Sequence, residues 1–114
     1  MSQNRIDVKI LKAENTNNLI SIIRKYSGES ISEIKKNIND GLSVLTCYYI
    51  YESDKLPSFL ETIKALEQKG AKLEIIQRIR NSSRVIDNDI VKNLIERDRL
   101  IAEQIQEYDD NMSD

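Results

Sequence analysis

Residues 64–75 read Lys-Ala-Leu-Glu-Gln-Lys-Gly-Ala-Lys-Leu-Glu-Ile, and they decide the fold because a helix is expected to stop at Gly70 and a strand to begin at once. Upstream, Pro57 suits the first turn of a helix. Apolar residues follow it at helical spacing, namely Phe59, Leu60, Ile63 and Leu66. Downstream, apolar and polar side chains alternate from Leu73 to Ile79, the period of a strand. This part of the chain therefore predicts a helix followed directly by a strand.

The N-terminal residues predict a strand and then two helices. Residues 5–11 alternate as a strand, and residues 19–26 carry an apolar helical stripe that ends before Gly28. Ser30 and Glu33 have the spacing of a capping box, which opens a second helix that stops at Asp40-Gly41. The apolar stripe of this second helix is expected to be Ile31, Ile34 and Ile38.

Residues 42–51 predict a strand because β-branched and aromatic side chains dominate them. Neither of its two alternating sets of side chains is clearly polar, so both faces of this strand are expected to be covered. The expected order over residues 5–79 is therefore strand, helix, helix, strand, helix, strand.

Beyond residue 79, residues 80–84 predict a polar connection, and Asp87 predicts the N-cap of a fourth helix over residues 88–108. Ile86 and Val91 flank this cap as a hydrophobic staple. Charged residues interrupt the apolar stripe of the helix, which is expected either to pack on the sheet or to mediate a homodimer. The sequence thus divides into a domain over residues 1–80, a C-terminal amphipathic helix over 81–108 and a disordered acidic tail over 109–114.

The composition argues against a reaction centre. The 114 residues include no histidine, one cysteine and three glycines that each end a helix, and no glycine-rich phosphate loop or paired Cys/His metal spacing occurs. We therefore expect a protein that is not an enzyme and has no metal and no cofactor. The lone Cys47 and the absence of a signal or membrane-spanning segment in the sequence favour a cytoplasmic location, as a monomer or a helix-mediated homodimer.

Charge is distributed unevenly along the chain. Residues 1–80 carry 13 basic and 10 acidic side chains, and residues 81–114 carry 4 and 9, so the net charges are +3 and −5. From Glu103 onward every charged residue is acidic. An acidic extension of this kind is typical of an interaction tail.

Three segments resemble the C-terminal domain of the bacterial ribosomal stalk protein: Ser27-Gly28 between two helices, Ile31-Ser32-Glu33-Ile34-Lys35, and residues 64–75. In that family T-G-L-G-L-K-E-A-K stands at residues 27–35 and K-A-L-E-E-A-G-A at residues 64–71. The resemblance implies an α+β fold, a three-stranded antiparallel sheet with helices on one face, which the Clp-protease adaptor shares. It also implies recruitment of translational GTPases through basic residues of the first two helices, and Arg24 and Lys35 fall at basic positions of the family.

The sheet of such a fold normally has one open face, and the alternation predicts that this face is apolar. The side chains expected there are Leu11, Leu45, Cys47, Tyr49 and Ile76. Tyrosine is a frequent interface anchor, so Tyr49 and Tyr51 are candidate partner-binding residues.

These features favour a non-catalytic protein-binding module that binds its partner through the sheet face, the C-terminal helix and the acidic tail, with an immunity or inhibitor protein as the specific form. In that form the acidic residues Glu103, Glu107, Asp109 and Asp110 would enter a basic cleft of the partner. One alternative is a translation-associated factor that contacts a GTPase or ribosome through Arg24, Lys25, Lys35 and Lys36. A second alternative is an RNA-binding module that uses Arg78, Arg80 and Arg84, alone or together with the same four basic residues of the first two helices.

Overall fold

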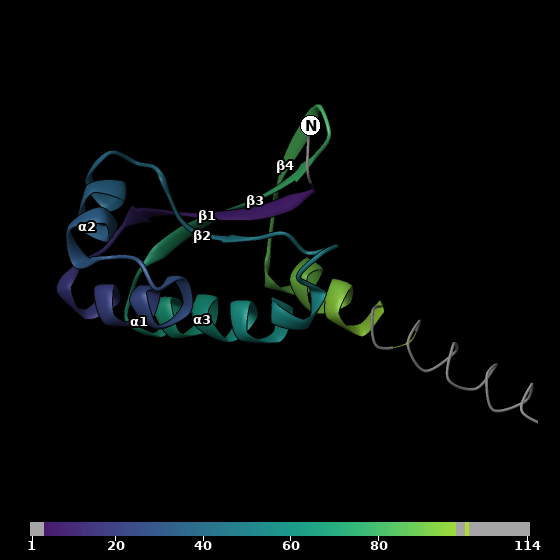
Figure 1. Cartoon of the computed structure of the whole chain (residues 1–114). Coiled ribbons are helices and arrows are strands. Elements are labelled where there is room, and N and C mark those ends of the chain that lie inside the picture. The colour runs from purple at the N-terminus through teal and green to yellow at the C-terminus, as the bar shows by residue number, and fades with distance from the viewer. Residues whose placement is uncertain (1–3, 98–99, 101–114) are drawn as a thin grey trace, which may run out of the picture.

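The computed structural model describes residues 4–97 and residue 100, and it has the predicted α+β class (Figure 1). The elements follow in the order β1 (Arg5–Lys12), α1 (Asn17–Ser27), α2 (Ile31–Asn39), β2 (Ser43–Cys47), the 3₁₀ helix η1 (Ser53–Lys55), α3 (Leu56–Gln68), β3 (Lys72–Ile79) and β4 (Ser82–Ile86). A further helix begins at residue 88 and is described to residue 97. The order predicted for residues 5–79 is confirmed.

The sheet has four antiparallel strands in the order β2-β1-β3-β4, so the prediction of three strands is wrong. β1 lies in the interior of the sheet and pairs with β2 on one side and β3 on the other. In Figure 1, α1 and α3 lie below the sheet and α2 lies at its left end, so no helix among the described residues covers the opposite face.

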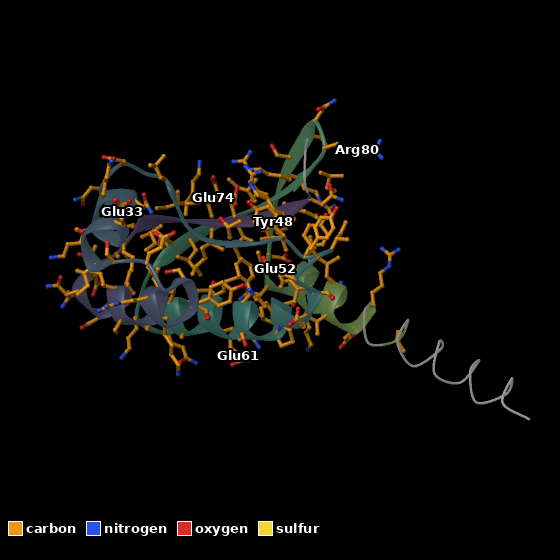
Figure 2. The ribbon with its side chains drawn as sticks, in the orientation of Figure 1. Glu33, Tyr48, Glu52, Glu61, Glu74 and Arg80 are labelled. Atoms are coloured by element: carbon orange, nitrogen blue, oxygen red, sulfur yellow. The ribbon has the colours of Figure 1, made fainter. Side chains whose placement is uncertain are left out.

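The additional strand, β4, occupies most of the segment predicted to be a polar connection. Arg80 and Asn81 form the turn between the paired residues Ile79 and Ser82. Arg80 has a left-handed backbone (φ 49°) and stands at the tip of this hairpin (Figure 2). β4 is an edge strand whose first four residues are exposed, and solvent-facing polar side chains are normal at such a position. The polar residues of β4 therefore reflect its position at the edge of the sheet, and the sheet continues past residue 80.

The hydrophobic core lies between the sheet and the helices. Phe59, Ile63 and Leu66 of α3 are fully buried and belong to the same core as Ile6 and Val8 of β1. The free Cys47 at the end of β2 belongs to the same core. This packing follows the helical and alternating patterns of the sequence.

β2 ends at Cys47, four residues earlier than the predicted strand over residues 42–51. The chain turns there because Glu52 folds back onto Tyr48: its side-chain Oε1 accepts a hydrogen bond from the Tyr48 amide at 3.3 Å. The Glu52 amide in turn donates to the Tyr48 carbonyl oxygen. Tyr49 and Tyr51 therefore belong to a turn, and the prediction that they extend a strand is wrong.

The open face of the sheet is largely polar, so the prediction of an apolar face is wrong. Cys47 pairs with Ile6 and Leu45 pairs with Val8, which places both β2 side chains on the helix-covered face. Because both alternating sets of this strand are apolar, its sequence did not indicate which set faces the core. The open face carries mainly Arg5, Asp7, Lys9, Leu11, Thr46, Glu74, Ile76, Arg78 and Val85.

The C-terminal helix begins as predicted, because Asp87 Oδ1 accepts a hydrogen bond from the Ile90 amide at 3.1 Å. Ile86 and Val91 on either side of the cap are both buried in the core. Asn88 Nδ2 donates to Glu67 Oε1 of α3 at 2.7 Å. The described part of this helix therefore lies beside α3, in the helix layer, and does not cover the open sheet face (Figure 1). The rest of the predicted helix, residues 98–99 and 101–108, lies outside the described residues except for Leu100, as does the predicted tail.

Replacing Asp87 with alanine is expected to lower the free energy of unfolding by about 1 kcal/mol, because the Ile90 amide loses its acceptor. Asp87→Asn keeps a capping oxygen and serves as the control. Its free energy of unfolding should fall by only about a few tenths of a kcal/mol. Urea unfolding followed by circular dichroism measures both values. Equal losses in the two variants would contradict the capping role.

Candidate functional site

A groove lies between α1 and α2, on the surface of the helix layer. α1 ends at Gly28, whose left-handed backbone (φ 73°) lets its amide donate to the Arg24 carbonyl oxygen at 2.8 Å. α2 begins three residues later, where Ser30 Oγ accepts from the Glu33 amide at 3.3 Å. This short connection holds the two helices together around a groove of about 500 Å³. Its lining residues are Asn17, Ile20, Ser21, Arg24, Lys25, Ile31 and Lys35.

The apolar part of the groove comes from one isoleucine on each helix. Ile20 of α1 is 6% exposed and closes the bottom of the groove against the core. Ile31 of α2 is 46% exposed, which is unusual for so large an apolar side chain. The sequence assigned Ile31 to the core stripe with Ile34 and Ile38, but of these only Ile34 is fully buried. Ile31 is the first residue of α2, so no preceding turn of that helix covers it.

The polar part of the groove is cationic. Arg24, Lys25 and Lys35 line it, and the lining residues include no carboxylate. α1 and α2 together carry four basic residues, these three and Lys36, against the single acid Glu33. Within residues 4–97, none of the four cations forms an ion pair. The groove thus presents positive charge that the rest of the described chain does not neutralise.

The predicted binding residues are therefore only partly brought together. Lys36 is exposed on α2 but is not among the residues that line the groove. Tyr49 is half-buried, packs against the core and accepts a hydrogen bond from Gln77 Nε2 at 3.1 Å, so its hydroxyl has a structural partner. Tyr51 is 77% exposed in the turn after β2 and is the most exposed large hydrophobic side chain among the residues that the structure describes. Glu103, Glu107, Asp109 and Asp110 lie outside the described residues.

Sequence reasoning identified the cations of the groove but missed its isoleucines. The family resemblance predicts Arg24 and Lys35 as contact residues. Ile20 lies next to the predicted stripe of α1 and Ile31 at the first position of α2. An isoleucine at a helix start, beside a run of cations, was the available signal.

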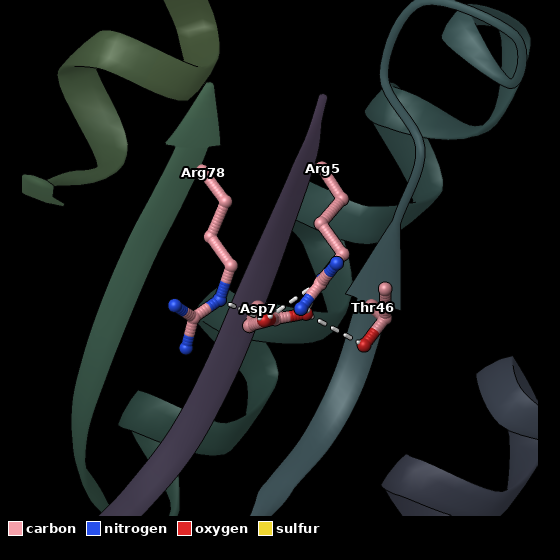
Figure 3. Close-up of polar contacts among 4 residues, drawn as sticks. All are labelled: Arg5, Asp7, Thr46 and Arg78. Atoms are coloured by element: carbon pink, nitrogen blue, oxygen red, sulfur yellow. Dashed lines mark hydrogen bonds and ion pairs between the residues drawn. The ribbon is translucent and has the colours of Figure 1, made fainter. Parts of the chain in front are cut away.

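A second polar cluster lies on the open sheet face around Asp7 (Figure 3). Asp7 is 3% exposed, and its carboxylate accepts from Arg78 Nε at 2.7 Å, from Thr46 Oγ1 at 2.9 Å and from Arg5 Nε at 3.1 Å. Burial raises the pKa of Asp7, but the bonds from Arg78, Thr46 and Arg5 outweigh this effect and leave the pKa below its usual value. Figure 3 shows the two guanidinium groups on opposite sides of the carboxylate. The cluster ties three strands together.

The arginines of the RNA-binding alternative do not share one surface. Arg78 lies on the open face and is bonded to Asp7. Arg84 pairs with Gln77 across β3 and β4, on the opposite face, and its Nε donates to Gln77 Oε1 at 2.8 Å. Arg80 stands in the hairpin turn between them (Figure 2).

The buried thiol of Cys47 is poorly suited to nucleophilic chemistry. Burial raises its pKa, so the thiolate, which is the reactive form, is disfavoured. In the described part of the chain, no group of three or more His, Cys, Asp or Glu side chains is placed to hold a metal ion.

Comparison with protein-family models, with curated proteins and with solved structures finds no match for this chain. The resemblance to the ribosomal stalk domain therefore stays a prediction. None of the helices in residues 4–97 has the length and apolar character needed to cross a membrane.

Proposed function

We propose that this protein is a non-catalytic protein-binding module that receives an acidic, amphipathic segment of a partner protein in the groove between α1 and α2. The observation that carries the proposal is the composition of the groove, which joins Ile20 and Ile31 to three cations without a carboxylate. An apolar bottom with a charged border is the arrangement by which grooves take amphipathic helices.

Each part of the groove has a distinct role in this proposal. The exposed Ile31 side chain gains free energy when a partner's apolar side chain covers it. Arg24, Lys25 and Lys35 attract the partner's carboxylates and exclude basic segments, which affects specificity and association rate more than affinity. Because these cations are exposed, their attraction weakens as salt is added.

The translation-associated alternative uses the same surface. Arg24 and Lys35, which fall at basic positions of the stalk family, both line the groove. In that form of the function the acidic segment belongs to a GTPase or to the ribosome. The immunity or inhibitor form instead depends on Glu103, Glu107, Asp109 and Asp110 in the tail.

Reversing two groove charges, with Arg24→Glu and Lys35→Glu together, is expected to weaken partner binding at least tenfold at low salt, or about 1.4 kcal/mol. Lys64→Glu with Lys92→Glu makes the same change of charge at exposed residues of α3 and the C-terminal helix, and should leave the affinity within about twofold. A photo-crosslinker at Ser21, in the groove, identifies the partner in cells, and a crosslinker at the exposed Ser83 of β4 is the control.

Support requires that the crosslink from Ser21 disappear in the groove variant and map to an acidic, amphipathic segment. A partner that the groove variant still binds, or one lost only in the Lys64/Lys92 variant, would overturn the proposal. Cosedimentation of ribosomes with the wild type but not with the groove variant would select the translation-associated form.

A further inference from the structure

The C-terminal residues of this chain have the chemistry that the groove selects, and the inference drawn from this rests on the proposed function. Residues 101–114 contain five acidic side chains and no basic one. Their larger apolar side chains recur at helical spacing and are Ile101, Ile105, Tyr108 and Met112. An acidic segment with one apolar stripe is the complement of a groove that combines isoleucines with cations that form no ion pair within residues 4–97.

The geometry of the helix layer keeps Ile101 away from the groove of its own copy. α1 and α2 contact β2, at one edge of the sheet, whereas the C-terminal helix follows β4, at the other edge. α3 lies between them, because it contacts α1 and bonds to Asn88 of the C-terminal helix. Neighbouring helix axes are about 8–10 Å apart, so the groove lies roughly 20 Å from the C-terminal helix.

The chain between the two is too short to span this separation. Only residues 98–100 separate Arg97 from Ile101, and four extended steps along the backbone reach roughly 14 Å. Residues 88–97 also run away from α2 in Figure 1. Seating the whole apolar stripe in the groove therefore requires a second copy of the chain.

We infer that residues 101–114 of one copy bind in the α1–α2 groove of a second copy, and that the exchange is reciprocal. A two-fold arrangement satisfies both grooves and both segments at once and closes the assembly at a dimer. The second contact forms within an already associated pair, which adds to the affinity of the first. In this dimer the groove is occupied by the chain itself, and a foreign partner binds by displacing the acidic segment.

Light scattering on the full chain tests the dimer, with a charge-swap experiment to identify the contact. The groove variant is Arg24→Glu, Lys25→Glu and Lys35→Glu, and the tail variant is Glu103→Lys, Glu107→Lys and Asp110→Lys. At low salt the wild type is expected at twice the 13.2 kDa chain mass, and each variant alone at the single mass. An equimolar mixture should recover the double mass, because each variant's segment then meets a groove of opposite charge.

A fluorescent peptide of residues 101–114 provides a second measurement. The peptide should bind the chain that lacks residues 101–114. Its affinity should fall at least tenfold when Arg24, Lys25 and Lys35 are replaced by glutamate, and also when salt is raised from roughly 20 mM to 500 mM. A wild type that is monomeric at every concentration, or a dimer that survives deletion of residues 101–114, would overturn the inference. The inference would also be overturned if the full chain were monomeric and did not bind the peptide while the truncated chain did. That result would mean that the segment docks in the groove of its own copy.

The result separates this inference from the function on which it rests. If the peptide fails to bind but the Ser21 crosslink to a foreign partner still depends on Arg24 and Lys35, the inference is wrong and the proposed function stands. If both fail, the groove is not a binding site.

Discussion

Replacing Asp7 with alanine is expected to lower the free energy of unfolding by about 2–3 kcal/mol at pH 7. The side chain of Asp7 is 5% exposed, and its carboxylate accepts hydrogen bonds from Arg5, Thr46 and Arg78. Its removal also leaves Arg5 and Arg78 directly opposite each other on β1 and β3, and like charges in that position repel. The arginine side chains are 38% and 34% exposed, so water relieves part of the cost and keeps it below that of a fully buried pair.

The loss should depend on pH in a defined direction. The pKa of Asp7 is lowered in the folded protein, so its contribution is fully present above the unfolded pKa of about 3.9. The contribution is lost as pH falls through the folded pKa, because the protonated carboxyl accepts fewer bonds from the arginines. The difference between wild type and Asp7→Ala is therefore constant from pH 7 to about 4.5 and shrinks in more acidic solution.

Urea unfolding at a series of pH values measures this difference, and Glu74→Ala is the matched control. Glu74 lies on the same open face, opposite Lys9, but is half-exposed. Its loss should cost less than about 1 kcal/mol. The difference in unfolding free energy between wild type and Asp7→Ala could instead grow in acid, or Asp7→Ala and Glu74→Ala could lose equal stability. Either result would show that the buried ion cluster does not stabilise the sheet.

Replacing Phe59 with alanine is expected to have the larger effect, a loss of about 3–5 kcal/mol. Phe59 is fully buried in the first turn of α3, and its ring lies 5.6 Å from that of Tyr26 at an angle of 60°. Truncation opens a cavity between α1 and α3 and removes this aromatic pair. Since small domains have limited stability, the variant should be largely unfolded near 37 °C.

Phe59→Leu keeps an apolar group in the same place and should cost about 1–2 kcal/mol. Ser58→Ala, one residue earlier and exposed, should change the stability by less than about 0.5 kcal/mol. Thermal unfolding followed by circular dichroism orders the three variants. A Phe59→Ala protein as stable as Phe59→Leu would mean that the core relaxes around the missing ring.

The elements over residues 5–79 were predictable because their signals are local. Gly28 and Gly70 end helices through left-handed backbones, and Ser30 and Asp87 cap helices through their own side chains. None of these features depends on a distant part of the chain.

Apart from the early end of β2, which the nearby Glu52 sets, the errors arose where a distant partner decides the outcome. The polar residues Ser82, Ser83 and Arg84 predict a connection, and only pairing with β3 makes them a strand. The face of Leu45 and Cys47 is set by their register with β1. The groove was equally out of reach, because Ile31 fits a core stripe by spacing and becomes a surface residue only where α2 meets α1.

The interior position of β1 has a consequence for synthesis of the chain. β1 is made first, yet one of its two neighbours, β3, is completed only at residue 79. Until then one edge of β1 stays unpaired, and Asp7 has Arg5 and Thr46 as partners but lacks Arg78. The sheet therefore forms only after residues that are distant in sequence have been synthesised, and the nascent chain has an unpaired strand edge for most of its translation.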